Sequence, residues 1–241
     1  GSYLEKNIGG IVGVTLRECT ISGCYSTATL TGNFTNSGGY YTNPEYWGED
    51  TIGGIVGAKF DGNLTITDCW FDGNIIANSY WGDFGGIIGY TDDFHGTVTI
   101  KNCMVTTTCM DATTDTDATD TNKAHYVNKC WLAFALSGTI ENNYWPLDNE
   151  KEYDPSPLKE ITEVTNESQG TAVSDFTSEK VLAGLQKNAG TDVKWVAGIT
   201  HPTFAWDDRN ILADYAKVDE AIQAAKEING SLYSNYSDVE A

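Results

Sequence analysis

Short runs in which every second residue is apolar recur along the first 150 residues and predict many brief β-strands. Gly, Asn or Asp interrupts each run after a few residues. Examples of such runs are Ile8–Val14, Leu64–Ile66, Cys69–Phe71, Asn74–Ala77 and Val98–Ile100. Strands this short cannot bury an apolar face alone, so we expect them to pack against one another.

Two short phrases repeat within this region. The first phrase, Gly-Gly-Ile-Val-Gly or Gly-Gly-Ile-Ile-Gly, contributes nine glycines: Gly9, Gly10, Gly13, Gly53, Gly54, Gly57, Gly85, Gly86 and Gly89. The second phrase, Thr-Ile plus two residues, ends at Cys24, Cys69 and Cys103, and a fourth copy ends at Asn143. Spacings of about 35 to 45 residues are typical of repeat architectures. The sequence therefore predicts a mainly β fold, a parallel β-solenoid (β-helix-like) of about four coils over residues 1–150.

In a solenoid, equivalent residues of successive coils stack in rows. We expect the double glycines to permit a tight bend or bulge where coil touches coil, since Gly accepts positive φ without cost, and the third glycine of each phrase to open the turn that follows. Cys24, Cys69 and Cys103 are expected to form an inward row of thiols, since parallel side-chain vectors would strain a disulfide. Cys109 and Cys130 flank a polar insertion, and a disulfide between them is an open alternative.

The repeats end near Pro155, and two further segments follow. Residues 151–210 are predicted to cap the solenoid at its open end, with a helix in Ser174–Asn188 that begins at Thr177 or Ser178. Residues 211–241 are predicted to be helical, and their apolar stripe is expected to pack on the solenoid or on further helices. We expect the chain to be part of a longer protein.

Charge limits the partners of this chain. Its 34 acidic residues outnumber 14 basic ones and give a net charge of −20, and no basic cluster is present. Nucleic acid and anionic membrane surfaces are therefore excluded as partners. No apolar run is long enough to insert directly into a membrane.

Aromatic residues in the insertions are candidates for ligand binding. Tyr46, Trp47, Tyr80 and Trp81 lie in two similar Tyr-Trp-Gly-acidic sequences, each just before a double glycine. Their flat faces suit sugar rings, although filling gaps between loops and core is the alternative role. Trp70 and Trp145 are expected on one face, either as an outward aromatic row or beneath an insertion.

Metal binding and catalysis have weaker candidates. Four carboxylates of the Thr/Asp-rich stretch Cys109–Asn122 are possible calcium ligands: Asp111, Asp115, Asp117 and Asp120. The alternative for this stretch is a solvated loop, and no other cofactor is expected. The isolated histidines lack a zinc-peptidase pattern, and no nucleophile-elbow motif occurs. We therefore expect a protein that is not an enzyme.

The repeated phrases resemble the GLUG motif, and Gly138–Trp145 is similar to its second half. Phe176–Trp206 resembles the segment that often closes such repeats, and Tyr215–Ala241 resembles the start of a FIVAR-type helical module. GLUG repeats occur in large bacterial surface proteins, including adhesins and the non-catalytic parts of IgA-specific metallopeptidases. The resemblance implies an extracellular location at the bacterial cell surface, within a secreted protein that has other domains. It also implies adhesion or spacing, with a host or bacterial surface glycan or protein as partner. A carbohydrate-binding module is the alternative, and a glycan-active β-helix enzyme comes third.

Overall fold

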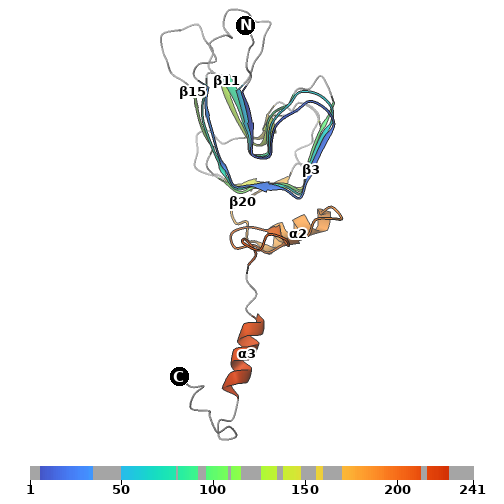
Figure 1. Ribbon diagram of the computed structural model, residues 1–241, viewed down its shortest axis with the longest axis vertical. Helices are drawn as coiled ribbons and strands as arrows, with labels where there is room; N and C mark the ends of the chain where they lie inside the picture. Colours follow the sequence, from blue (N-terminus) through green and yellow to red (C-terminus); the bar gives the residue numbers. More distant parts are fainter. Residues whose placement is uncertain are drawn as a thin grey trace, which may run out of the picture.

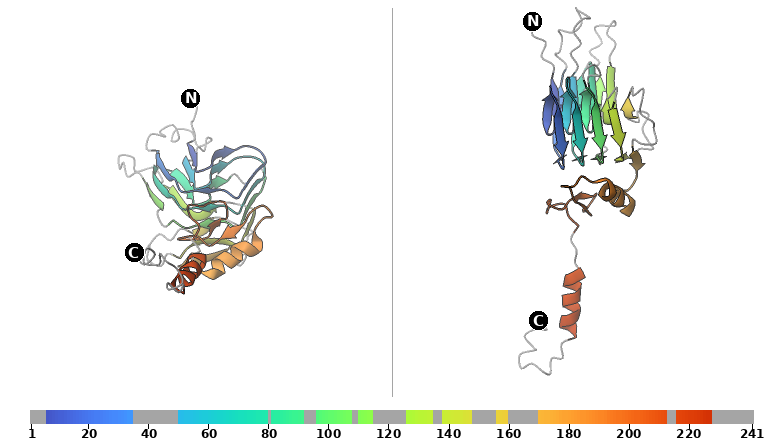
Figure 2. Two further views of the ribbon diagram at one scale, coloured as in Figure 1. Left: turned by 60° about the horizontal axis from the view of Figure 1, so that its bottom comes forward. Right: turned by 90° about the vertical axis from the view of Figure 1, so that its right-hand side faces the viewer.

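The computed structural model shows a mainly β chain whose large sheets are parallel, as the sequence predicts (Figure 1). It describes residues 6–34, 50–79, 81–91, 96–107, 110–114, 126–134, 138–147, 156–159, 170–212 and 216–227. Strands of successive repeats lie side by side, which the edge-on view in Figure 2 makes clear.

The first sheet has the order β1-β6-β11-β16-β12-β7-β2, with β19 also paired to β16. Its strands are β1 (Asn7–Gly9), β2 (Val12–Thr15), β6 (Asp50–Gly53), β7 (Val56–Lys59), β11 (Trp81–Gly85), β12 (Ile88–Thr91), β16 (Tyr126–Phe134) and β19 (Ser156–Lys159). Because β1 and β2 are neighbours in the chain and form its two ends, this sheet is nearly closed.

Three smaller parallel sheets complete the repeats. The second sheet contains β3 (Cys19–Ser22), β8 (Leu64–Thr67), β13 (Val98–Lys101) and β17 (Gly138–Glu141). The third sheet contains β4 (Tyr25–Ser26), β9 (Trp70–Phe71), β14 (Met104–Val105), β18 (Asn143–Pro146) and β20 (Gly170–Val173). The fourth sheet contains β5 (Thr29–Asn33), β10 (Asn74–Ser79) and β15 (Met110–Thr114).

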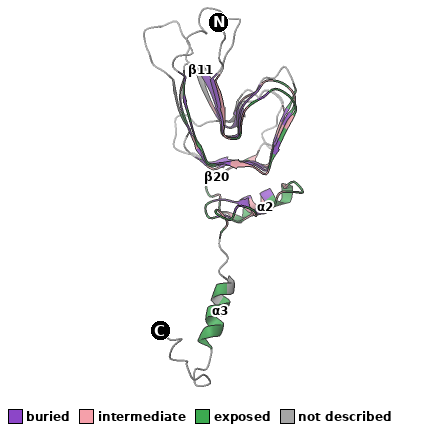
Figure 3. Ribbon diagram, viewed as in Figure 1, coloured by how far each residue is buried: buried purple, intermediate pink, exposed green. Residues whose placement is uncertain are grey.

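The pairing register places equivalent residues of the repeats next to one another. In the second sheet, Ile21, Ile66, Ile100 and Ile140 form one row. All four are buried, whereas the residues that alternate with them along each strand point outward. Alternation along each strand and repetition between strands therefore build the main apolar core of the repeats (Figure 3).

The double glycines mark a sharp bend between two arms of the first sheet. A Cβ on Gly53 would lie 1.8 Å from the carbonyl oxygen of Val56, across the bend. A Cβ on Gly54 would lie 2.0 Å from the carbonyl oxygen of Gly86, in the next repeat. Backbone therefore approaches backbone both within a repeat and between repeats, and no side chain fits at these positions.

This geometry corrects two expectations about the glycines. The described glycines with positive φ are Gly23, Gly62, Gly96, Gly138 and Gly170, none of which belongs to the first phrase. The double glycine lies at a bend where neighbouring repeats touch, as expected, but the reason for glycine there is close approach and not positive φ. The third glycine of each phrase lies inside β2, β7 or β12 and does not open a turn.

Left-handed backbone does occur at one corner of each repeat. Gly23, Asp68, Asn102 and Asn142 occupy equivalent positions after the second-sheet strands, with φ of 61°, 51°, 57° and 50°. Gly, Asn and Asp tolerate this conformation better than other residues. The second phrase therefore carries one of these three residues just before its final position.

The Thr/Asp-rich insertion begins as a strand. β15 pairs in parallel with β10, so the prediction of a loop is wrong for Met110–Thr114. The neighbouring strand supplies hydrogen-bond partners, and this outweighs the polar composition.

Residues 174–212, hereafter the docked segment, pack on the outer face of the third sheet (Figures 1 and 2). The segment contains α2 (Glu179–Asn188) and an antiparallel pair, β21 (Trp195–Val196) and β22 (Thr203–Phe204). The predicted helix is thus present, and it begins after Ser178. The segment lies along the side of the stacked repeats, which differs from the expected cover over their end.

A second helix, α3 (Ala216–Lys226), follows the docked segment. It begins later than expected because Ile211 pairs with Gly198 in an isolated bridge. Val218 and Ile222, part of the predicted apolar stripe, are 51% and 45% exposed.

Candidate functional site

The cysteine row lies within the core. Cys69 and Cys103 are fully buried, Cys24 is half-buried, and all three are free thiols that pack with the main apolar cluster. The hydrogen bond with Cys69 and burial raise the pKa of Cys24. The hydrogen bond with Cys103 and burial raise the pKa of Cys69. A buried, protonated thiol is a poor nucleophile, so this row has a structural role.

Asn143 takes the place of cysteine in the fourth repeat. The backbone nitrogen of Cys103 donates to its Oδ1 at 2.9 Å, and its Nδ2 donates to the carbonyl oxygen of Ile100 at 3.0 Å. Cys130 is buried in β16, and Cys109 lies outside the described residues, so the proposed disulfide remains a prediction.

The outer face of the third sheet carries an aromatic row. Tyr25, Trp70, Met104 and Tyr144 are in register, and the rings of Tyr25 and Trp70 stack with centroids 4.0 Å apart. Trp145 points the other way, into the main core. The expectation that Trp70 and Trp145 share a face is therefore wrong, because a shift of one residue along a strand reverses the side-chain direction.

The docked segment covers this aromatic row. Its buried apolar side chains pack on Trp70, Met104 and Tyr144, and they are Val181, Leu185, Trp195 and Phe204. The cover thus comes from a distant part of the sequence and not from an insertion between repeats.

A row of polar side chains runs beside the aromatic row, at the left-handed corners. Asn142 Nδ2 donates to Asn102 Oδ1 at 2.6 Å, and Asn102 Nδ2 donates to Asp68 Oδ1 at 2.5 Å. Each side-chain amide also donates to a carbonyl oxygen of α2. Asn142 Nδ2 donates to Gly184 at 3.2 Å, and Asn102 Nδ2 donates to Leu185 at 3.0 Å. We call Asp68, Asn102 and Asn142 the corner row.

Asp68 is the strongest acceptor of the corner row. Its Oδ1 also accepts from Trp195 Nε1 at 3.0 Å, and its Oδ2 accepts from the backbone nitrogen of Gly190 at 3.0 Å. Because Asp68, Asn102 and Trp195 are all buried, these bonds form away from water. The corner row therefore supplies hydrogen-bond partners for backbone groups at the C-terminal end of α2, and it fixes the indole of Trp195.

A second anchor joins Asp72 of the repeats to His201 of the docked segment. His201 Nε2 lies 3.6 Å from Asp72 Oδ2, and Thr106 Oγ1 donates to Asp72 Oδ1 at 2.5 Å. Burial alone would raise the pKa of Asp72, but the neighbouring imidazole of His201 and the hydrogen bond from Thr106 outweigh burial and lower it.

The third anchor is Asp207, a buried carboxylate at the turn after β22. It accepts from Asn210 Nδ2 at 2.6 Å, Thr203 Oγ1 at 2.8 Å and the Tyr25 hydroxyl at 3.3 Å. Burial would raise the pKa of Asp207, but these three hydrogen bonds and the charge of Arg209 hold it below its usual value.

The predicted ligand-binding residues fall mostly outside the described residues. Tyr46, Trp47 and Tyr80 are not described, and Trp81 is described only as the first residue of β11. Asp111 is exposed in β15, whereas Asp115, Asp117 and Asp120 are not described. Within the described ranges no three His, Cys, Asp or Glu residues are grouped to hold a metal ion. The sugar and calcium sites remain predictions.

Sequence reasoning missed the corner row, although its signal was present. The position before Cys24, Cys69, Cys103 and Asn143 is always Gly, Asp or Asn. The aromatic cluster around Trp206 was also missed, because its partner Tyr25 lies far away in the sequence.

Comparison with known proteins gives one match. Residues 5–31 match the GLUG motif, so the chain contains a GLUG-like region at its first repeat. Neither the curated proteins nor the solved structures contain a match to this chain. Among the described residues, no helix has the length and apolar character needed to cross a membrane.

Proposed function

We propose that this chain is a non-catalytic repeat region of a larger, secreted bacterial surface protein, acting in adhesion or as a structural spacer. In this proposal residues 1–150 wind as a parallel β-solenoid of about four coils, and residues 211–241 begin a FIVAR-like helical module. The GLUG motif at residues 5–31 supports this assignment.

One observation carries the proposal: the repeated residues are used in packing repeat on repeat. The double glycines sit where backbones meet, and the buried cysteines stack in the core. The fourth member of the second phrase forms the left-handed corner of each repeat, and in three repeats its side chain holds the docked segment. These repeated residues maintain the fold. Any binding function of the repeats therefore falls to residues on their exposed faces.

The dimensions favour adhesion over spacing. Strands in a sheet lie about 4.8 Å apart, so four stacked coils add only about 20 Å of length. The lateral faces of the sheets extend over all repeats (Figure 2). A short stack with continuous lateral faces is better suited to presenting a surface than to spanning a distance.

Beads coated with the purified chain test this proposal against host epithelial cells and bacterial cells. Beads carrying folded wild-type protein should attach more than beads carrying the same chain after unfolding by heat. Attachment lost with the fold supports adhesion, while equal attachment of both leaves spacing as the role. Turnover of any polysaccharide by the purified chain would contradict a non-catalytic region.

A further inference from the structure

Trp206 is the exposed end of an aromatic column. Its ring lies 5.6 Å from that of Tyr25 at an interplanar angle of 18°, and Tyr25 in turn stacks on Trp70. Phe204 packs against Trp206 at 5.4 Å and 22°. Trp206 nevertheless remains 61% exposed, unlike Trp70, Trp195 and Phe204. A large flat apolar surface is thus held in a fixed orientation at the surface.

The turn that presents Trp206 is tightly held. Asp207 accepts the three hydrogen bonds described above, and its backbone nitrogen donates to the carbonyl oxygen of Phe204 at 2.9 Å. The backbone nitrogen of Ala205 donates to the carbonyl oxygen of Lys194 at 2.9 Å. Bonds on both sides of Trp206 reduce the entropy that binding a ligand would otherwise cost.

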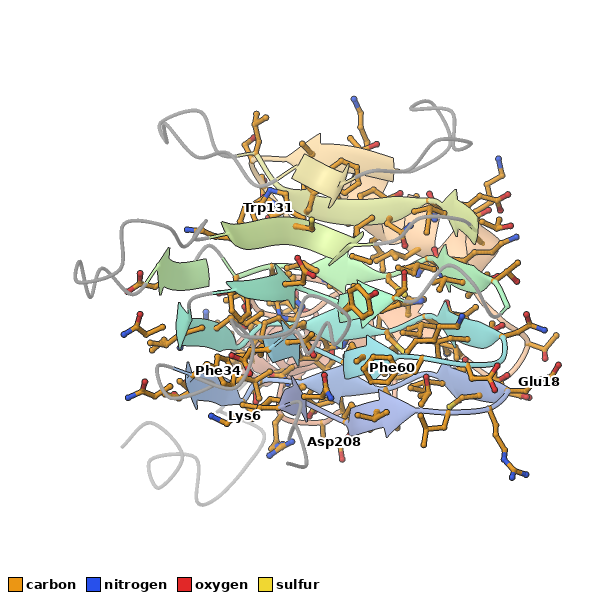
Figure 4. All side chains as sticks on the ribbon, turned by 90° about the horizontal axis from the view of Figure 1, so that it is seen from above. Lys6, Glu18, Phe34, Phe60, Trp131 and Asp208 are labelled. Atoms are coloured by element: carbon orange, nitrogen blue, oxygen red, sulfur yellow. The ribbon has the colours of Figure 1, made fainter. Side chains whose placement is uncertain are left out.

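Polar groups surround this aromatic surface. Arg209 Nη2 donates to the Tyr25 hydroxyl at 2.7 Å and its Nε lies 3.9 Å from Asp207 Oδ1, while the Arg209 side chain is 83% exposed. Asp208 is also exposed and lies at the first-repeat end of the stack (Figure 4). A fixed guanidinium and a carboxylate therefore stand within a few residues of a flat apolar face.

We propose that the exposed face of Trp206 binds an uncharged sugar ring of a surface glycan. The apolar C–H face of a pyranose stacks on an indole, and nearby charged groups hydrogen-bond its hydroxyls. The net charge of −20 disfavours acidic and phosphorylated ligands, including nucleotides. This proposal goes beyond a structural role, and it concerns other residues than the loop aromatics Trp47 and Trp81 of the sequence prediction.

The expected affinity sets the form of the experiment. One stacked ring with a few hydrogen bonds gives a Kd of about 1 mM, or about −4 kcal/mol. Neutral polymers offer many rings, so multivalency makes weak binding visible. The wild-type chain is run in native gels that contain a galactomannan, a mixed-linkage β-glucan or a xylan, and in gels that contain polygalacturonate.

The informative variants are Trp206→Ala, Trp206→Tyr and Ile199→Ala. Ile199 is a matched control because it is 59% exposed in the same segment. We expect at least one neutral polymer to retard wild type, with at least tenfold weaker retardation for Trp206→Ala. Trp206→Tyr should retain part of the effect, since it keeps a flat face, and Ile199→Ala should retain all of it.

Several outcomes would overturn the sugar site. These are no retardation by any neutral polymer, equal retardation of wild type and Trp206→Ala, or retardation by polygalacturonate alone. Near-UV circular dichroism of each variant shows whether the docked segment is intact. If Trp206→Ala disturbs it, Trp206→Tyr decides, because full loss in a folded Tyr variant contradicts simple stacking. Loss of the sugar site would leave the adhesion or spacer proposal unaffected.

Discussion

The repeats and the docked segment are stabilised in different ways. In the repeats, each residue of a row contacts the equivalent residues of the neighbouring repeats, so the same contact recurs along the row. In the docked segment, each contact is used once: Trp195 with Asp68, His201 with Asp72, and Asp207 with Tyr25. Periodic contacts can be recognised in the sequence, whereas single contacts between distant residues cannot.

The largest expected effect comes from adding a methyl group at the bend. Gly53→Ala would bring a Cβ to 1.8 Å from the Val56 carbonyl oxygen, and neither backbone can move without breaking the sheet. We expect the free energy of unfolding to fall by about 3 kcal/mol or more in urea titrations. Gly13→Ala is the matched control, because its nearest atom is 3.4 Å away and its effect should stay within about 0.5 kcal/mol. Similar values for both would contradict the close-approach explanation.

The next effect isolates the docked segment. Asp68→Gly removes three hydrogen bonds but keeps the left-handed corner, since Gly23 adopts it in the first repeat. Leaving buried donors without partners should cost about 2 to 3 kcal/mol of docking free energy.

Hydrogen exchange can locate this loss. Amides of α2 should lose protection in Asp68→Gly while those of β8 keep it. Asp61→Ala is the control, because Asp61 is exposed and accepts a local hydrogen bond from the backbone nitrogen of Gly62. Equal loss in α2 and β8 would show that the two regions unfold as one unit.

Acidification should release the docked segment before the repeats unfold. The pKa values of Asp72 and Asp207 are lowered by their hydrogen bonds and charged neighbours, against the effect of burial. Such carboxylates stabilise the fold above their unfolded pKa of about 3.9, and this contribution is lost as pH falls through the folded pKa. Near-UV dichroism of the aromatic column should therefore decrease below about pH 4 before the far-UV signal does. Asp207→Asn should flatten this dependence, and exposed Asp208→Asn should not.

The smallest effect is expected in α3. Ile222→Ser should change the free energy of unfolding by less than about 0.5 kcal/mol, because Ile222 is exposed. Leu185→Ala in α2 is the contrasting variant, since Leu185 is fully buried and its truncation should cost about 2 to 5 kcal/mol. A loss above 1 kcal/mol for Ile222→Ser would show that α3 packs on another surface.

The sequence predicts the rows of stacked side chains well, because each row corresponds to a residue type that recurs at the same position of successive repeats. It predicts a bend with contact between repeats at Gly53, but it does not separate close approach from positive φ, since both require the absence of a Cβ. It also misplaces Trp145, because in the fourth repeat Tyr144 takes the place of Trp70 and one residue decides the face.

The docked segment shows where sequence reasoning stops. Its helix is predictable from local signals at Ser178, Val181 and Leu185. Its position along the side of the repeats depends on the corner row, whose members lie far from α2 in the sequence. The exposure of Trp206 likewise follows from three-dimensional contacts with Tyr25 and Phe204.

The docked segment contacts side chains from every repeat between Tyr25 and Tyr144. Its length is therefore matched to the number of repeats between these two residues. Duplication of one repeat, the usual way in which such arrays grow, would move Tyr25 one step away from Tyr144. The helix and hairpin have fixed lengths and could no longer reach both ends. Relatives that keep this segment should therefore keep the number of repeats between the equivalents of Tyr25 and Tyr144 and vary mainly in the loops.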